Sequence, residues 1–200
     1  MKRNLLVFVF FFFVATLFPN QGNSYSSDPK QFITEIVNEA KKILVATNSK
    51  EFKEKKLSEI ALKAADIKGI GFYTLGKYRK ELSDEDLNEY SKLFEKYFLK
   101  SFTSRLTDYS DPKIEVLSAE VLNPKYTIVQ SLLLATDKKP EVKIDWRVYT
   151  KNPDKPLIRD LIVEGLSLAR TQKEEFASVI ESNNGDVKKL FITLQEFVDK

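Results

Sequence analysis

The chain has 200 residues, with 32 Lys and Arg against 29 Asp and Glu, and it contains neither histidine nor cysteine. The missing histidine excludes an imidazole base for a serine nucleophile and imidazole ligands for zinc, and the missing cysteine excludes disulfides and a lipid-modified lipoprotein cysteine. The formal net charge of +3 is too small to predict nucleic-acid binding, while lysine- or carboxylate-based catalysis stays open.

Residues 1–24 have the pattern of a secretory signal peptide. Lys2 and Arg3 precede the apolar run 5–18, and polar and small residues follow up to Ser27. A helix over that run would span about 21 Å, less than a bilayer core of about 30 Å, so an uncleaved anchor is the less favoured alternative. We predict cleavage near Ser24 or Ser26, export of the protein, and a single domain over residues 25–200.

Helical periodicity fills the first half of the mature chain. Asp28 followed by Pro29 is typical of a helix start, and Ser83 opens the longest helix. The acids at 84–86 fit the positive end of that helix better than a metal cluster. The predicted helices cover residues 28–44, 50–65, 72–78 and 83–109.

Beyond Pro112 the apolar period changes to two, which predicts strands. We expect four of them, over residues 114–118, 125–135, 142–148 and 157–170, and their short connections favour an antiparallel meander. Gly165 would mark a bend within the fourth strand. The sequence 171–174, Thr-Gln-Lys-Glu, fits a capping box that begins a helix to Glu181, and a last helix covers residues 186–198. Helices, a meander and further helices make an α+β domain.

The third strand predicts a sheet with one apolar and one charged face. Residues 142, 144, 146 and 148 are apolar, and they alternate with Lys143, Asp145 and Arg147. We expect the long aromatic helix to cover the apolar face. The pattern is compatible with a filled core and with an apolar cavity, because both have the same residue types.

No residue pattern predicts catalysis. Asp145 and Asp160 could be imagined as a carboxylate pair, but structural pairing with Arg147 or Arg159 is favoured. Ser167 has no histidine partner and no nucleophile-elbow sequence. The chain also has no phosphate loop and no dinucleotide fingerprint, so we predict no catalytic residue, metal or cofactor.

Three segments carry a resemblance to a known family. They are the leucine-glycine turn at residues 74–79, the aromatic helix at 83–109, and the block at 163–168 that is followed by Phe176. In order and spacing they resemble the MlaC family of periplasmic phospholipid-binding proteins, also called toluene-tolerance auxiliary proteins. The chain departs from many relatives at Gln172-Lys173, where they carry a tyrosine-arginine pair.

The resemblance implies a sheet of the nuclear-transport-factor-2 type wrapped by helices, with an apolar pocket between sheet and helices. It implies a periplasmic carrier that is not an enzyme and that shuttles phospholipid between the inner and outer membranes, maintaining outer-membrane lipid asymmetry. The implied partners are an ABC-type lipid transport complex in the inner membrane and a lipoprotein-porin complex in the outer membrane, with phospholipid as cargo and not as cofactor. On this basis we expect the pocket to be lined by Phe72, Tyr73, Leu75, Tyr78, Phe94, Phe98, Phe102, Val116, Leu132, Leu134, Ile144, Trp146, Val148, Val163 and Leu166.

Three alternatives stay open from the sequence. The cargo could be a hopanoid or another terpenoid lipid. The fold could carry an enzyme with Asp145 as a carboxylate base, although strand phase places Asp145 on the charged face. The protein could also be an envelope component that binds only proteins and has a solid core.

Overall fold

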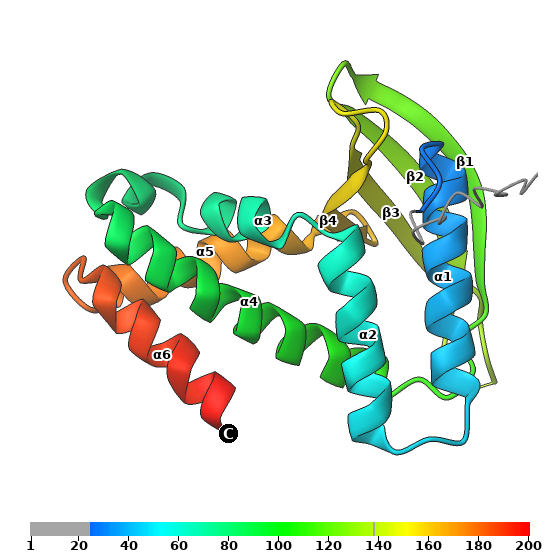
Figure 1. Cartoon of the computed structure of the whole chain (residues 1–200), viewed down its shortest axis with the longest axis horizontal. Helices are drawn as coiled ribbons and strands as arrows, with labels where there is room; N and C mark the ends of the chain where they lie inside the picture. Colours follow the sequence, from blue (N-terminus) through cyan, green and yellow to red (C-terminus); the bar gives the residue numbers. More distant parts are fainter. Residues whose placement is uncertain (1–24, 138) are drawn as a thin grey trace, which may run out of the picture.

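The chain folds into a curved antiparallel sheet, a helix across its concave face, and a group of helices beside it (Figure 1). The computed structural model describes residues 25–137 and 139–200, so the predicted signal peptide lies outside the described residues. The helices are α1 (Pro29–Val45), α2 (Lys50–Ala64), α3 (Ile67–Thr74), the 3-10 helix η1 (Gly76–Glu81), α4 (Asp84–Leu106), α5 (Leu168–Ser182) and α6 (Val187–Asp199). The strands are β1 (Ile114–Asn123), β2 (Tyr126–Leu133), β3 (Val142–Tyr149), β4 (Leu157–Val163) and β5 (Leu166–Ser167). Consecutive strands are neighbours in the sheet, so the predicted α+β meander is confirmed with one additional short strand.

Several helices begin where local capping predicts. The Asp28 carboxylate accepts a hydrogen bond from the backbone N–H of Gln31 (2.8 Å), and the Ser83 hydroxyl accepts one from the N–H of Asp86 (3.1 Å). Both contacts satisfy N–H groups that have no partner within the helix. The predicted short aromatic helix begins earlier than expected, at Ile67, because the Asp66 side chain caps it through the N–H of Gly69 (2.9 Å).

Helix α1 covers the concave face of the sheet, with α2 beside it (Figure 1). Its residues Phe32, Ile33 and Ile36 pack with Val129 of β2 and Val148 of β3, both of which are fully buried. We call this set the sheet cluster. The prediction that α4 covers this face is wrong. Several helices of the chain have an apolar face, and the sequence pattern does not decide which of them docks on the sheet.

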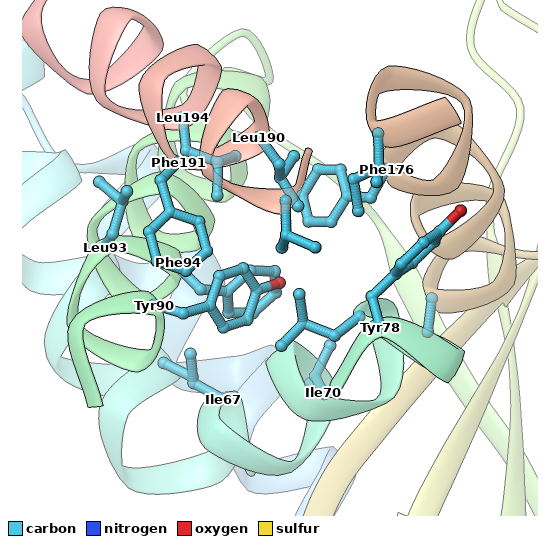
Figure 2. Packing of buried hydrophobic residues seen from close by; sticks show 14 residues of the cluster. Ile67, Ile70, Tyr78, Tyr90, Leu93, Phe94, Phe176, Leu190, Phe191 and Leu194 are labelled. Carbon is cyan, nitrogen blue, oxygen red and sulfur yellow. The ribbon is translucent and has the colours of Figure 1, made fainter. Parts of the chain in front are cut away.

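Helix α4 instead forms the centre of a second hydrophobic cluster with α3, α5 and α6 (Figure 2). Tyr90 and Phe94 are almost completely buried, and their rings stack with centroids 5.7 Å apart. Phe191 of α6 lies 5.6 Å from Tyr90, and Phe176 of α5 meets Phe94 edge to face at 6.3 Å. Figure 2 shows these rings pointing into the middle of the helical group, which we call the helical cluster.

Strand β4 ties the helical group to the sheet. Ala65, just after α2, forms a parallel bridge with Ile158, and the N–H of Asp66 donates to the carbonyl of Ile158 (2.9 Å). The Arg159 guanidinium forms an ion pair with Asp66 at 2.6 Å and lies over the Tyr149 ring, 3.6 Å from its centroid. Backbone and side-chain contacts together therefore fix the start of α3 against β4.

The predicted bend at Gly165 is a tight hairpin turn. Val163 of β4 pairs antiparallel with Leu166 of β5, leaving Glu164 and Gly165 as the two turn residues. Both have positive φ, 49° for Glu164 and 82° for Gly165, a conformation that favours glycine and that a two-residue hairpin turn of type I′ requires at both positions. The continuous strand predicted over 157–170 is therefore two strands.

The helix that follows begins three residues before the predicted capping box. Ser167 is the N-cap of α5, and its hydroxyl accepts a hydrogen bond from the N–H of Arg170 (3.1 Å). Thr171 lies inside the helix and donates its hydroxyl to the Ser167 carbonyl (3.1 Å). The capping-box prediction is wrong because a competing cap lies one turn earlier.

A buried tyrosine hydroxyl in the helical cluster gives a pH-dependent prediction. The Tyr90 hydroxyl lies 2.9 Å from Thr74 Oγ1 and donates to the Gly71 carbonyl at 3.2 Å. Burial raises the pKa of Tyr90 above its usual value. A raised folded-state pKa contributes stability that is complete below the unfolded pKa of about 10 and is lost as the pH rises above it.

We therefore expect Tyr90→Phe to lower the free energy of unfolding by about 1–2 kcal/mol at pH 7. This difference from wild type should shrink as the pH rises above about 10, since only the wild type then loses stability through ionisation of this phenol in the unfolded chain. Urea unfolding of the wild type and of Tyr90→Phe, at pH 7 and at a pH above about 10, measures this difference. A difference that stays constant with pH would contradict the burial argument.

Candidate functional site

Helix α4 carries an apolar stripe that connects the two clusters. Phe94, Phe98, Phe102 and Leu106 are spaced by four residues, which places them along one side of the helix. Phe94 is buried in the helical cluster, whereas Leu106 packs against the sheet cluster. Between them, the Phe98 and Phe102 rings stack with centroids 5.8 Å apart and stay partly exposed. The middle of the stripe is therefore apolar surface that the protein's own side chains leave incompletely covered.

The concave face of the sheet also carries partly buried apolar side chains. Strand register pairs Trp146 with Leu161 and Ile144 with Val163, and all four side chains are partly buried. Trp146 packs at the edge of the sheet cluster, as Leu106 does, so the partly buried surfaces of helix and sheet extend from the same cluster. We call these partly buried residues the apolar patch; its members are Phe98, Phe102, Ile144, Trp146, Leu161 and Val163.

The polar atom of the tryptophan in this patch is satisfied internally. The indole N–H of Trp146 donates to the Ser131 hydroxyl at 2.9 Å, and that hydroxyl donates to the Ile144 carbonyl at 3.0 Å. Ser131 is fully buried. Because no hydrogen-bonding demand of Trp146 is left open, its ring presents an apolar surface that suits hydrocarbon.

Some predicted pocket residues fill the two cores. Leu75, Tyr78 and Phe94 are buried in the helical cluster, and Val148 is buried in the sheet cluster. The Tyr78 hydroxyl also donates to Glu181 at 3.1 Å. Val116 packs at the edge of the sheet cluster. The structure thus places these residues in or beside the two hydrophobic clusters and not in the apolar patch.

Other predicted residues are not brought to the apolar patch. Leu132 pairs with Lys143 and with Glu115, which places it on the charged face of the sheet, and Leu134 follows with the same strand phase. Leu166 in the hairpin is 58% exposed. The run of three leucines at 132–134 does not by itself indicate which of them faces the helices, because strand phase cannot be read from consecutive apolar residues.

One residue of the apolar patch, Leu161, is not among the residues predicted to line the pocket. Leu161 lies beside Trp146 in the register. Its phase agrees with that of Val163, so the alternation within β4 already contained the signal.

The remaining two predicted residues line a surface hollow instead. Phe72 and Tyr73 of α3 lie in a hollow of about 470 Å³ together with Arg79 of η1 and Lys173 of α5. Phe72 is partly buried against the helical cluster, while Tyr73 is 46% exposed. This hollow therefore combines aromatic and cationic side chains. It shares no residue with the apolar patch.

The polar residues of β3 and β4 are structural. Asp160 is 4% exposed, accepts hydrogen bonds from the Ser167 hydroxyl (2.6 Å) and the Ala169 N–H (3.0 Å), and forms an ion pair with Arg147 at 3.2 Å. The predicted structural pairing of Asp160 is therefore confirmed. Asp145 lies on the charged face and pairs with Lys143 at 3.4 Å. Since Ser167 both caps α5 and binds Asp160, its hydroxyl has a structural role.

Within residues 25–137 and 139–200, no helix combines the length and the apolar character that crossing a bilayer requires. In the same part of the chain, no cluster of three or more acidic side chains could hold a metal ion.

Together, fold and site define an α+β binding protein whose helix-wrapped sheet presents partly buried apolar surface. A family model described as "MlaC protein" matches residues 31–196, and the chain belongs to this family. A phospholipid-binding protein from Ralstonia solanacearum, solved in complex with a phospholipid, has the same fold with a TM-score of 0.70. It is 18% identical, and the match covers 84% of this chain and 94% of that one. No curated protein sequence matches the chain significantly.

Proposed function

We propose that this protein binds phospholipid, with the acyl chains lying against the apolar patch between α4 and the sheet. The observation that carries the proposal is the partly buried stripe at Phe98 and Phe102, which lies between the two hydrophobic clusters. Family membership supports the same cargo, and so does the phospholipid bound by the structural relative.

The energetics suit a carrier. Each methylene removed from water gains about 0.8 kcal/mol, so two chains of roughly thirty methylenes gain on the order of 25 kcal/mol in an apolar site. Insertion of the same acyl chains into a bilayer gains nearly the same free energy. Exchange between bilayer and protein can thus be close to balanced, while free lipid in water is very costly.

The proposal extends to location and partners. The pattern at residues 1–24 supports export, and the family supports a periplasmic protein that moves lipid between the inner and outer membranes. An ABC-type complex in the inner membrane and a lipoprotein-porin complex in the outer membrane would give the transfer its direction. The carrier itself would need no catalytic residue and no cofactor.

Vesicle-to-vesicle transfer of a fluorescent phospholipid tests this function. We expect the transfer rate to rise in proportion to the concentration of the mature protein, with donor and acceptor vesicles kept intact. A rate no higher than with an equal concentration of a non-binding protein would refute the carrier role.

A further inference from the structure

The hollow formed by α3, η1 and α5 shares no residue with the apolar patch. Its volume is about 470 Å³, and a smaller hollow of about 170 Å³ adjoins it through Gly76 and Lys173. The larger one is lined by Phe72, Tyr73, Gly76, Arg79, Lys80 and Lys173. We call it the cationic groove, because half of its lining is Lys or Arg and none is acidic.

Gly76 lets the Lys173 side chain pack closely against the backbone in the lining of the cationic groove. This glycine has φ of +57°, and a Cβ atom there would lie 2.8 Å from Cε of Lys173. The lysine stem therefore lies against the glycine, and its ammonium reaches over the Tyr73 ring, 5.3 Å from the centroid. The absence of a Cβ at position 76 leaves room for the lysine stem, and the cation–π contact with Tyr73 favours this position of the charge.

Arg79 is held by an aromatic ring as well. Its guanidinium lies over Phe72, 4.4 Å from the ring centroid, and the ammonium of Lys68 lies 5.5 Å from the same ring. A cation–π contact uses none of the guanidinium N–H donors, and within the described residues no hydrogen bond from Arg79 occupies them, so they are available to an acceptor.

The charges of the cationic groove are not neutralised within the described residues. There, Arg79, Lys80 and Lys173 form no ion pair with a carboxylate, whereas neighbouring Lys77 pairs with Glu181 at 3.4 Å. Removal of Lys2 and Arg3 with the predicted signal peptide would leave a formal net charge of 3 − 2 = +1. A concentration of three unpaired cations is therefore a local feature and not the consequence of a generally basic surface.

We propose that the cationic groove binds a phosphate ester, with the phosphate oxygens on Arg79, Lys80 and Lys173. A guanidinium and two ammonium groups match several phosphate oxygens at once, and the rings of Phe72 and Tyr73 offer apolar contact to the esterified carbon atoms. Such an ester occurs in lipid headgroups at a membrane surface and in soluble metabolites. This second site goes beyond cargo binding, because it lies on residues that the apolar patch does not use.

The test compares two triple variants of the mature protein with equal loss of charge. The groove variant is Arg79→Gln, Lys80→Gln and Lys173→Gln; the control variant is Lys42→Gln, Lys63→Gln and Lys189→Gln, at exposed positions on α1, α2 and α6. Binding is measured to vesicles of phosphatidylcholine alone and to equimolar phosphatidylcholine and phosphatidylglycerol. Glycerol 3-phosphate and inorganic phosphate are titrated separately, with amide NMR shifts of Gly76 and Lys80 as the readout.

We expect the wild type to bind the anionic vesicles or the soluble phosphates in a salt-sensitive manner, and the control variant to resemble it. A cation near an anionic membrane surface is worth roughly fivefold in affinity, so the groove variant should bind on the order of 100-fold more weakly. Binding to vesicles alone would identify a membrane headgroup as the source, and binding of glycerol 3-phosphate would identify a soluble ester.

Three results would overturn the phosphate site: no wild-type binding to any of these probes, equal losses in both variants, or tighter binding of poly-glutamate than of the phosphate probes. Co-purified lipid is measured on the same samples. Its retention by the groove variant would show that cargo binding stands even if the second site fails, so failure of either proposal is recognised separately.

Discussion

Phe102→Asp will abolish phospholipid retention by the purified protein while leaving the protein folded. Among residues 25–137 and 139–200, Phe102 is outside both hydrophobic clusters, and its ring stacks on Phe98 of the apolar patch. A carboxylate at this position would meet acyl chains without a partner, and burial of an unpaired charge costs several kcal/mol. Loss of even 4 kcal/mol corresponds to about 1,000-fold weaker binding. Lipid content per protein after gel filtration is the measurement.

Phe52→Asp is the matched control. Phe52 is 46% exposed near the N-terminus of α2, where an acidic residue is favoured, and it belongs to neither cluster. We expect this variant to keep its lipid. If Phe102→Asp retained as much lipid as Phe52→Asp, the acyl chains would not lie on the α4 stripe.

Asp160→Ala will lower the free energy of unfolding by about 3 kcal/mol. The substitution removes the acceptor for the Ser167 hydroxyl and the Ala169 N–H, and it leaves Arg147 without its ion pair. The carboxylate is buried between the sheet and the start of α5, where water replaces these contacts poorly. Denaturant unfolding followed by circular dichroism measures the change.

A neighbouring carboxylate serves as the control for Asp160. Asp145 is on the neighbouring strand β3, and within residues 25–137 and 139–200 its ion pair is with Lys143, whose side chain is exposed, while its own Oδ1 atom is buried without a hydrogen-bond partner there. Asp145→Ala should therefore change stability by less than about 1 kcal/mol. Equal effects of the two substitutions would show that Asp160 does not anchor α5.

The parts of the fold that depend on local interactions were predictable. The start of α1 at Asp28 and of α4 at Ser83 follow from caps within a few residues, and the β1–β4 meander follows from alternation and short turns. The start of α5 was not predictable in this way. Its cap at Ser167 is reinforced by Asp160, a partner that only the folded sheet brings close.

The candidate site was only partly predictable for a similar reason. Phe98, Phe102, Ile144 and Trp146 follow from helix and strand periodicity. The same periodicity also selected Phe94 and Val148, which the structure buries in the two clusters. Whether an apolar side chain fills a core or borders it depends on which elements pack against it, and α1 rather than α4 took that place on the sheet.

The most direct test of the central claim is organic extraction of the purified mature protein followed by mass spectrometry. We expect diacyl phospholipid in about stoichiometric amount in the wild type and its loss in Phe102→Asp. A protein that co-purifies with no lipid and takes none up from vesicles would contradict it, and an extract containing only terpenoid lipid would replace phospholipid as the cargo.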